Sequence, residues 1–569
     1  MVLVFLLSIL TVVNIFSFKF LKPKYSHDYY FNFRRNFNNH NNKSIGDLNN
    51  IYFYIKSNHK NIKLCISGLK KPGEKFTIDP KKHIFFFNSF SGYIMLEKLM
   101  FKDFNVNKII IGNFKLGSGQ GLVFNHKKDS LYYPLDPIKI FKKQSCLKQC
   151  MSHHKRKFLG IATELEYRGV ELCLFVSKNY LDAYLKNENI YTAKIREKYV
   201  NKNLLSRRNE VYNYSGGFSF SYRNEKKFDI GMNMIYTRFN KKFKLCNNSD
   251  FKDSLLSDMD NLFYGDTSIN ISIFNSFLIE KMKIYWEYAR SFNDFKDILF
   301  NYGSALILGC KFRFNMLLKY VCLIRYYSKD YHNFYGNGFG SGKGLVYKNF
   351  KGCMNNEIGI CNGFQIKLRS NLVMKFVIDL CVIPKKTFTV TSQYRTQFIF
   401  NLKYNLSIFE YILFQCKYIN SKSDIVVNNI DYYKNIYEFV YMKINVKKNI
   451  FQIRNNSNII LSIKPEKEKV YFGVCFHEKV SFNIWRFKNI IHFSIIKASD
   501  KSPIYLFKTT QYNFNKKIKF INENLFNLIL NPKLIIKNNL LIDFLCSLKF
   551  SLKKKIRYQF SISLRYFKT

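Results

Sequence analysis

The amino-acid sequence predicts an all-β protein, a transmembrane antiparallel β-barrel of roughly 14–18 strands. Three observations lead to this fold class. Apolar and polar residues alternate strictly near the end of the chain, similar runs recur without a convincing amphipathic helix between them, and the apolar face is aromatic, with 40 Tyr and 59 Phe against 2 Trp. The strands of a soluble β-sandwich show the same alternation of apolar and polar residues. In lipid, however, a sheet must close into a barrel so that no backbone edge stays unpaired.

The clearest alternation lies between Ile542 and Tyr566. Nearly every even position is apolar and most odd positions are polar, which is typical of strands with one apolar and one polar, solvent-facing side. Lys553–Lys555 interrupt the run and predict a hairpin turn. The same pattern predicts strands in residues 218–236, 282–288, 305–316 and 318–326, and the less regular stretches predict loops at 125–157, 240–268, 328–356 and 421–436.

The N-terminal part of the chain differs in composition from the rest. Residues 1–18 are almost entirely apolar, which predicts a signal peptide or an uncleaved N-terminal anchor. Residues 19–50 are polar and rich in Asn, which predicts a linker. The outer-membrane β-barrel is therefore expected to span residues 51–569.

The chain is strongly basic, since 91 Lys and Arg against 39 Asp and Glu give a net charge of +52. Such a charge would suit nucleic acid, but the basic residues are spread along the whole chain and no nucleic-acid partner is expected. On the alternating runs they fall on the polar phase, which predicts a basic lumen formed by Lys311, Arg313, Lys319, Arg325, Arg557 and Arg565.

No motif points to catalysis, a metal or a cofactor. The glycine runs at 117–121 and 336–344 lack the spacing of a nucleotide-binding loop, and glycine-permitted bends are expected there. Cys146, Cys150, His153 and His154 have zinc-like chemistry but are too compact for an ordinary site. Glu287 and Asp379 are interpreted as ordinary lumen carboxylates, and the 13 Cys, without regular spacing, as small hydrophobic residues.

Several segments, taken in chain order, resemble outer-membrane β-barrel proteins of Bacteroidota that are usually labelled helix-hairpin-helix domain proteins. The segment with Gly112, Asn113, Phe114, Gly119, Gln120, Gly121 and Leu122 resembles their "GD/N-aromatic…GQGL" element, and Asn356, Glu357 and Gly359 resemble an "NE-G" strand start. Weaker matches lie at 71–76, 158–162, 206–210 and 379–380. The resemblance implies an envelope barrel with structural motif residues and no established reaction. The linker is too short for the helix-hairpin-helix domain, so DNA binding is not implied.

These observations predict an outer-membrane protein with a passive role as a pore, a transport component or an envelope scaffold. Its expected partners are the lipid bilayer, the barrel-assembly machinery and small anionic solutes. The AT-biased composition, together with the resemblance, suggests a Bacteroidota endosymbiont with a reduced genome. Two alternatives stay open. A soluble nucleic-acid-binding protein would have an apolar interior, and a barrel-type envelope enzyme would need a converging polar cluster in the lumen.

Overall fold

The computed structural model describes most of the chain after residue 24. The described residues are 25–37, 46, 49–71, 73–76, 87, 89–101, 104–125, 146–150, 157–194, 201–224, 228–243, 263, 265–293, 302–315, 317–336, 338–339, 356–384, 390–407, 410–427, 431–450, 453–466, 469–484, 487–498, 504–509, 516–521, 525–536, 540–551 and 554–568. The predicted signal peptide or anchor at 1–18 lies outside them.

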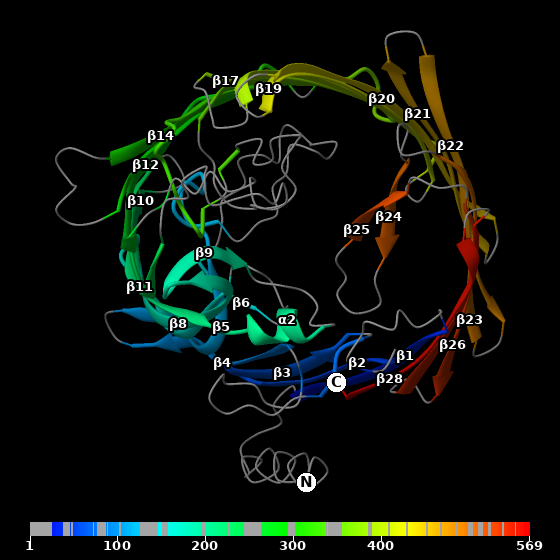
Figure 1. Ribbon diagram of the computed structural model, residues 1–569, viewed down its shortest axis with the longest axis horizontal. Coiled ribbons are helices and arrows are strands. Elements are labelled where there is room, and N and C mark those ends of the chain that lie inside the picture. The colour runs from blue at the N-terminus through cyan, green and yellow to red at the C-terminus, as the bar shows by residue number, and fades with distance from the viewer. Residues whose placement is uncertain are drawn as a thin grey trace, which may run out of the picture.

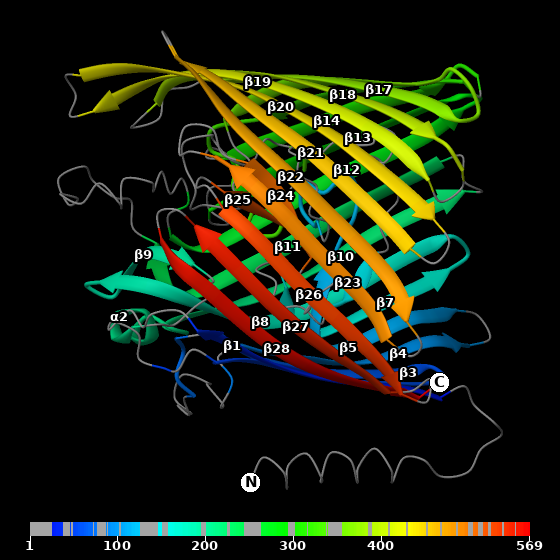
Figure 2. The ribbon, with the colours of Figure 1, turned by 90° about the vertical axis from the view of Figure 1, so that its right-hand side faces the viewer.

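Twenty-four antiparallel strands form a closed wall (Figures 1 and 2). In wall order they are β1 (Tyr25–Phe37), β2 (Asn49–His59), β3 (Ile62–Lys70), β4 (Ser89–Met100), β5 (Asn105–Leu116), β7 (Phe158–Tyr167), β8 (Val170–Lys186), β10 (Val211–Asn224), β11 (Phe228–Phe243), β12 (Gly265–Ile279), β13 (Met282–Phe292), β14 (Tyr302–Arg313), β15 (Leu318–Tyr327), β16 (Glu357–Lys367), β17 (Leu372–Ile383), β18 (Val390–Asn405), β19 (Tyr411–Val427), β20 (Asp431–Ile450), β21 (Ile453–Glu466), β22 (Lys469–Ile484), β23 (Phe487–Lys497), β26 (Leu525–Ile536), β27 (Leu540–Ser551) and β28 (Lys554–Lys568).

The first and last strands close the wall. β1 pairs with β2 on one side and with β28 on the other, and both pairings are antiparallel. Each other wall strand pairs with its neighbours in chain order, apart from short insertions. These insertions are β6 (Leu147–Gln149), β9 (Asn189–Lys194), the hairpin of β24 (Ile504–Thr509) with β25 (Lys516–Ile521), and one short helix, α2 (Lys202–Ser206).

The apolar phase of the strands faces outward, as expected for a transmembrane barrel. On β28, Phe560, Ile562, Leu564 and Tyr566 remain 36–43% exposed, while Ser563 on the opposite phase is buried. The predicted hairpin at 218–236 has the expected faces, because Phe218, Phe220 and Tyr222 lie opposite Met234, Met232 and Ile230. Among the described residues, no helix is both long and apolar enough to cross a membrane.

The two ends of the barrel differ. At one end, called here the short-turn end, every connection between wall strands has two to five residues, and both β1 begins and β28 ends there. The opposite end, the long-loop end, carries every longer connection, including 117–157, 328–356 and 498–524. This asymmetry is typical of bacterial outer-membrane barrels.

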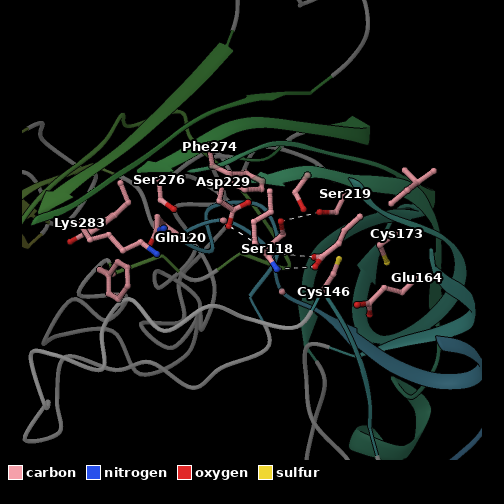
Figure 3. Close-up of a pocket in the computed structure, with 18 residues that line it drawn as sticks. Ser118, Gln120, Cys146, Glu164, Cys173, Ser219, Asp229, Phe274, Ser276 and Lys283 are labelled. Atoms are coloured by element: carbon pink, nitrogen blue, oxygen red, sulfur yellow. Dashed lines mark hydrogen bonds and ion pairs between the residues drawn. The ribbon is translucent and has the colours of Figure 1, made fainter. Parts of the chain in front are cut away.

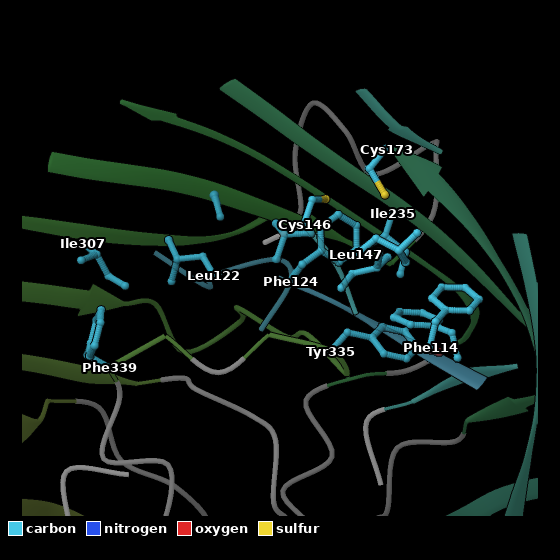
Figure 4. Packing of buried hydrophobic residues seen from close by; sticks show 14 of the residues in the cluster. Phe114, Leu122, Phe124, Cys146, Leu147, Cys173, Ile235, Ile307, Tyr335 and Phe339 are labelled. Carbon is cyan, nitrogen blue, oxygen red and sulfur yellow. The ribbon is translucent and has the colours of Figure 1, made fainter. Parts of the chain in front are cut away.

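Part of the long-loop chain folds into the barrel interior. Residues 117–125, 146–150 and 328–336, called here the lumen plug, pack against the inner wall in one buried cluster. Its members include Leu122, Phe124, Ile235, Ile307 and Tyr335 (Figure 4). The β24–β25 hairpin also lies inside the ring of strands (Figure 1). A barrel wider than the porins has room for such internal segments.

Three predictions need correction. The wall has 24 strands rather than 14–18. Residues 25–37 of the predicted linker form β1, a full member of the wall. Residues 421–436, predicted to be a loop, mostly belong to β19 and β20, which run in register as far as Val427 and Asp431. The barrel therefore begins before residue 51.

Candidate functional site

The GQGL segment forms a tight turn over a buried carboxylate. Glu287 projects inward from β13, and its Oε2 atom accepts hydrogen bonds from the backbone N–H groups of Gln120 at 2.5 Å and Leu122 at 3.2 Å. Its Oε1 atom accepts one from the Ser272 hydroxyl at 2.8 Å. Backbone N–H groups that converge in a turn form a concave anion-binding site, and here a wall carboxylate fills it.

The glycines of this turn are needed for two separate reasons. Gly119 and Gly121 have φ angles of +55° and +91°, which side chains other than Gly rarely adopt. In addition, a Cβ atom at position 119 would lie 2.8 Å from Oε2 of Glu287. The motif therefore lets the backbone approach the carboxylate closely, which is a structural role.

A second plug segment holds this turn from the other side. The carbonyl of Leu122 accepts hydrogen bonds from the Tyr331 hydroxyl at 3.0 Å and the Asn333 amide at 2.7 Å. The Tyr335 hydroxyl lies 3.1 Å from Oγ of Ser215 on the wall. The plug is thus fastened by buried hydrogen bonds as well as by apolar packing, and each buried polar group left without a partner would cost free energy.

The earlier part of the same motif lies in β5. Gly112 has a φ angle of +111°, and a Cβ atom there would lie 2.4 Å from the Gly92 carbonyl oxygen. The Asn113 amide donates to that carbonyl at 3.0 Å. Phe114 is fully buried and stacks on Phe158 with ring centroids 5.4 Å apart. These three residues support the strand from which the plug departs.

The "NE-G" residues belong to a buried ion network on β15 to β18. Arg325 donates to Glu357 at 2.6 Å and to Asp379 at 2.5 and 3.2 Å. Arg395 also donates to Asp379, at 3.3 Å. Two cations and two carboxylates balance here, so Arg325 faces the lumen side but is neutralised. Asn356, with a φ angle of +51°, immediately precedes β16.

The other predicted basic residues have different surroundings. Lys311 and Arg313 on β14 and Lys319 on β15 share the inward phase of Ala305, Ile307 and Leu323, close to the short-turn end. Arg565 forms an ion pair with Asp28 across the β1–β28 seam at 2.7 Å. The strand position of Arg557, opposite Lys549, is described, but its side chain is outside the described part.

Like-charged residues face each other directly on this inner wall. Lys283 of β13 lies opposite Lys311 of β14, and Arg313 of β14 lies opposite Lys319 of β15. Directly opposed like charges destabilise a sheet. Elsewhere on the inner wall opposite charges pair, for example Arg223 of β10 with Glu171 of β8 at 3.1 Å.

A small polar pocket lies between the plug and the wall (Figure 3). It encloses about 60 Å³ and is lined by Ser118, Gln120, Ser219, Asp229 and Lys283 among others. This volume accommodates a few water molecules but no larger solute. It does not bring together the residues predicted to line a conducting lumen.

Two motifs that suggested ligand chemistry have other surroundings. Cys146 and Cys150 are buried in the plug, while His153 and His154 lie outside the described residues. No group of three metal-ligating side chains occurs within the described ranges. In the second glycine run, a Cβ atom at Gly336 would lie 1.9 Å from the Leu122 carbonyl oxygen, so this glycine permits close packing of the plug.

Sequence patterns missed some of the residues that build this site. The alternation predicts Glu287 and Asp379 only as ordinary lumen carboxylates, and no local pattern marks Tyr331, Asn333 or Arg395. A carboxylate on the inward phase was visible in the alternation of β13, but its partners lie 165 and 167 residues away along the chain. No local signal could have paired them.

Comparison with known proteins gives a likeness of fold only. No protein-family model and no curated protein matches the chain. The copper transporter OprC has a TM-score of 0.47 at 7% identity, covering 97% of this chain and 82% of that one. The siderophore receptor PirA from Pseudomonas aeruginosa has 0.44 at 6%, covering 97% and 81%. OpdK from Pseudomonas aeruginosa, solved with vanillate, has 0.31 at 8%, covering 63% and 93%. At such values the likeness carries no conclusion about the function of this chain.

Proposed function

We propose that this chain is an outer-membrane β-barrel that lets small anionic solutes pass without catalysis, as a pore or as the channel component of a transport system. Its apolar exterior supports a place in a lipid bilayer, which would require insertion by the barrel-assembly machinery. The short-turn end would face the periplasm and the long loops would face outward, following the usual arrangement of such barrels.

The observation that carries this proposal is the pair of like-charged contacts on the inner wall. Lys283 opposite Lys311 and Arg313 opposite Lys319 gather four cationic side chains on one part of the inner wall. Rings or arcs of Lys and Arg favour anions in other pores, and the ionised side chains act most strongly where the lumen is narrow and less screened.

The lumen plug supports an upper limit on the size of the solutes that could pass through the barrel. Because its segments are fastened to β10–β15 by buried hydrogen bonds and packing, the plug narrows one side of a wide barrel. Solutes would then pass along the part of the inner wall that the plug leaves uncovered, which would include the short-turn end of β14 and β15 where Lys311, Arg313 and Lys319 lie. A passive route of this kind requires no cofactor and no metal.

The alternatives are less well supported. A soluble nucleic-acid-binding protein was expected to hide its apolar face in the interior, whereas Ile324, Leu380 and Ile562 are exposed on the outside. An envelope enzyme needs a converging polar cluster, and the carboxylates in the described interior are engaged in hydrogen bonds or ion pairs. An envelope scaffold without conductance stays a second candidate, which the experiment below separates.

We also propose kinship with the Bacteroidota barrel family named above. The support is that two of its motif segments fall at positions with specific backbone demands, namely the turn over Glu287 and the glycine opposite Arg325. Loss of either would disturb the plug or the wall, which gives such motifs a physical reason to recur.

The test is the reversal potential of the full chain in planar bilayers under a KCl gradient. The wild type should prefer Cl⁻, and the double variant Lys311→Gln with Lys319→Gln should lose most of that preference. Lys448→Gln, an outward-facing residue near the same end, is the control and should change nothing. Cation preference in the wild type would overturn the anion route, and complete absence of conductance in correctly folded protein would favour the scaffold.

A further inference from the structure

Two cysteine side chains from separate elements meet inside the barrel. Cys146 begins the 146–150 segment of the lumen plug, and Cys173 projects inward from β8. Both are buried, both line the pocket between plug and wall, and their side chains lie near each other in both close-up views (Figures 3 and 4).

The plug side of this contact is held in place by the backbone. The Cys146 carbonyl accepts a hydrogen bond from the Gly117 N–H at 2.9 Å, and the next residue, Leu147, donates its N–H to Glu164 at 3.1 Å. β6 then pairs antiparallel with the end of β5. The Cys146 side chain is therefore fixed at the point where the plug returns to the wall.

The wall side is equally fixed. Cys173 sits in the middle of β8, directly opposite Glu164 on β7 and Ser219 on β10. A thiol on a central strand, hydrogen-bonded on both sides of its backbone, has little freedom to move away. Two cysteine side chains that rigid elements hold beside the same pocket are candidates for a disulfide bond.

We propose that Cys146 and Cys173 form a disulfide that ties the lumen plug covalently to the barrel wall. This inference rests on the proposed outer-membrane location, because only an exported chain meets an oxidising compartment. The two thiols would lose two protons and two electrons to a protein or small-molecule disulfide, which is reduced to two thiols while the new S–S bond forms. Oxidation precedes docking of the plug, while the thiols are still accessible.

Other cysteines are less suited to this role. Cys310 and Cys322 also lie directly opposite each other, on β14 and β15. However, they lie on the outward phase of exposed Leu308 and Ile324, where lipid would keep a polar oxidant away. Cys150, the second cysteine of the plug, donates its backbone N–H to Asn113 on β5 instead of approaching β8. A bond between Cys146 and Cys173 would enclose the connection from the plug to β8 and restrict its unfolded state.

The test is peptide mapping of the full chain exported in a bacterial host. Cells are treated with N-ethylmaleimide, the protein is denatured without reductant in fresh N-ethylmaleimide so that buried thiols also react, and the digest is analysed by mass spectrometry. The expected result is a linked peptide pair containing Cys146 and Cys173, with loss of both alkylation sites. In Cys146→Ser the pair should disappear and Cys173 should become alkylated, whereas Cys475→Ser, a buried cysteine on β22, should leave the pair intact.

Two results would overturn the tether. One is complete alkylation of both residues in the exported protein, and the other is a bond from Cys173 to Cys150. The same chain is also folded in detergent with reduced and oxidised glutathione. This experiment asks whether the two cysteines can form the bond at all, independently of the cellular compartment that the chain reaches. A bond that forms there but not in cells would overturn the native tether through its location. The reversal-potential measurement does not depend on the disulfide, so it tests the proposed anion route separately from the tether.

Discussion

Gly359 lies directly opposite Arg325 on the neighbouring strand, and the space that a side chain at position 359 would take is filled by the arginine head group. A Cβ atom at Gly359 would be 2.5 Å from the Cζ atom of Arg325. The guanidinium lies over this glycine while it bonds to Glu357 and Asp379. The small residue and the ion network therefore depend on each other.

Replacement of Gly359 by Ala is expected to destabilise the barrel, because the added methyl group must displace a buried guanidinium. The cost should be about 1–3 kcal/mol, the usual range for overpacking. Urea unfolding in lipid vesicles would measure it. Gly216→Ala is the matched control, since its Cβ would make only ordinary contacts at 3.7 and 3.8 Å. Equal stability of both variants would contradict the interpretation.

Replacement of Glu287 by Ala should loosen the lumen plug. It removes the acceptor of two backbone N–H groups, and each buried donor left unpaired costs about 1–3 kcal/mol. Glu287→Gln keeps an acceptor oxygen and should be milder. We expect larger single-channel conductance in the Ala variant than in the Gln variant, with both above wild type. Identical conductance in all three would show that this contact does not hold the plug.

Acid should also release the plug through His332. Burial lowers the pKa of this imidazole to about 4 from its usual 6.5, and its ring lies 5.0 Å from that of Phe263. Since the released histidine takes a proton at higher pH than the buried one, docking loses stability as the pH falls from about 6.5 towards 4, by on the order of 3 kcal/mol.

Conductance recorded between pH 7 and pH 4 would test this, with a rise expected in the acid range. His332→Gln carries no titrating group at this position, so its conductance should change much less over the same interval. A wild type and a variant with the same acid response would assign the effect to other groups.

Deletion of residues 25–37 should prevent closure of the barrel, because β1 bridges β2 and β28 through eleven paired positions on each side. A closed barrel resists SDS until it is heated, so the compact band of the unboiled protein should be lost. Deletion of residues 504–521, which contain the internal β24–β25 hairpin, should leave that band in place. If the band persisted without residues 25–37, the segment would act as the linker that its composition suggested.

Local alternation was sufficient to predict the strands and the direction of their faces. The run from Ile542 to Tyr566 became β27 and β28 with its apolar phase outward, because a strand places successive side chains on opposite faces whatever its neighbours are. The same signal was present but overlooked in β1, where Tyr29, Phe31 and Phe33 share one phase and Asn32 is buried on the other.

The strand number was underestimated for a related reason. In 421–427 and 431–436 polar residues occur on both phases, which hides the alternation of β19 and β20. A strand that extends beyond the apolar zone has water on both sides, so no face must be apolar. Composition therefore suggested a loop where the backbone continues to pair.

What the sequence by itself determined is the class of the fold, the outward apolar face and the inward position of most lumen residues, since each depends on neighbours two residues apart. What only the tertiary structure decided is which charges are neutralised and what fills the lumen. Arg325 meets Asp379, and the GQGL turn meets Glu287, through strand register and wall closure. Such contacts join residues far apart in the chain, and their energies depend on burial that no local pattern records.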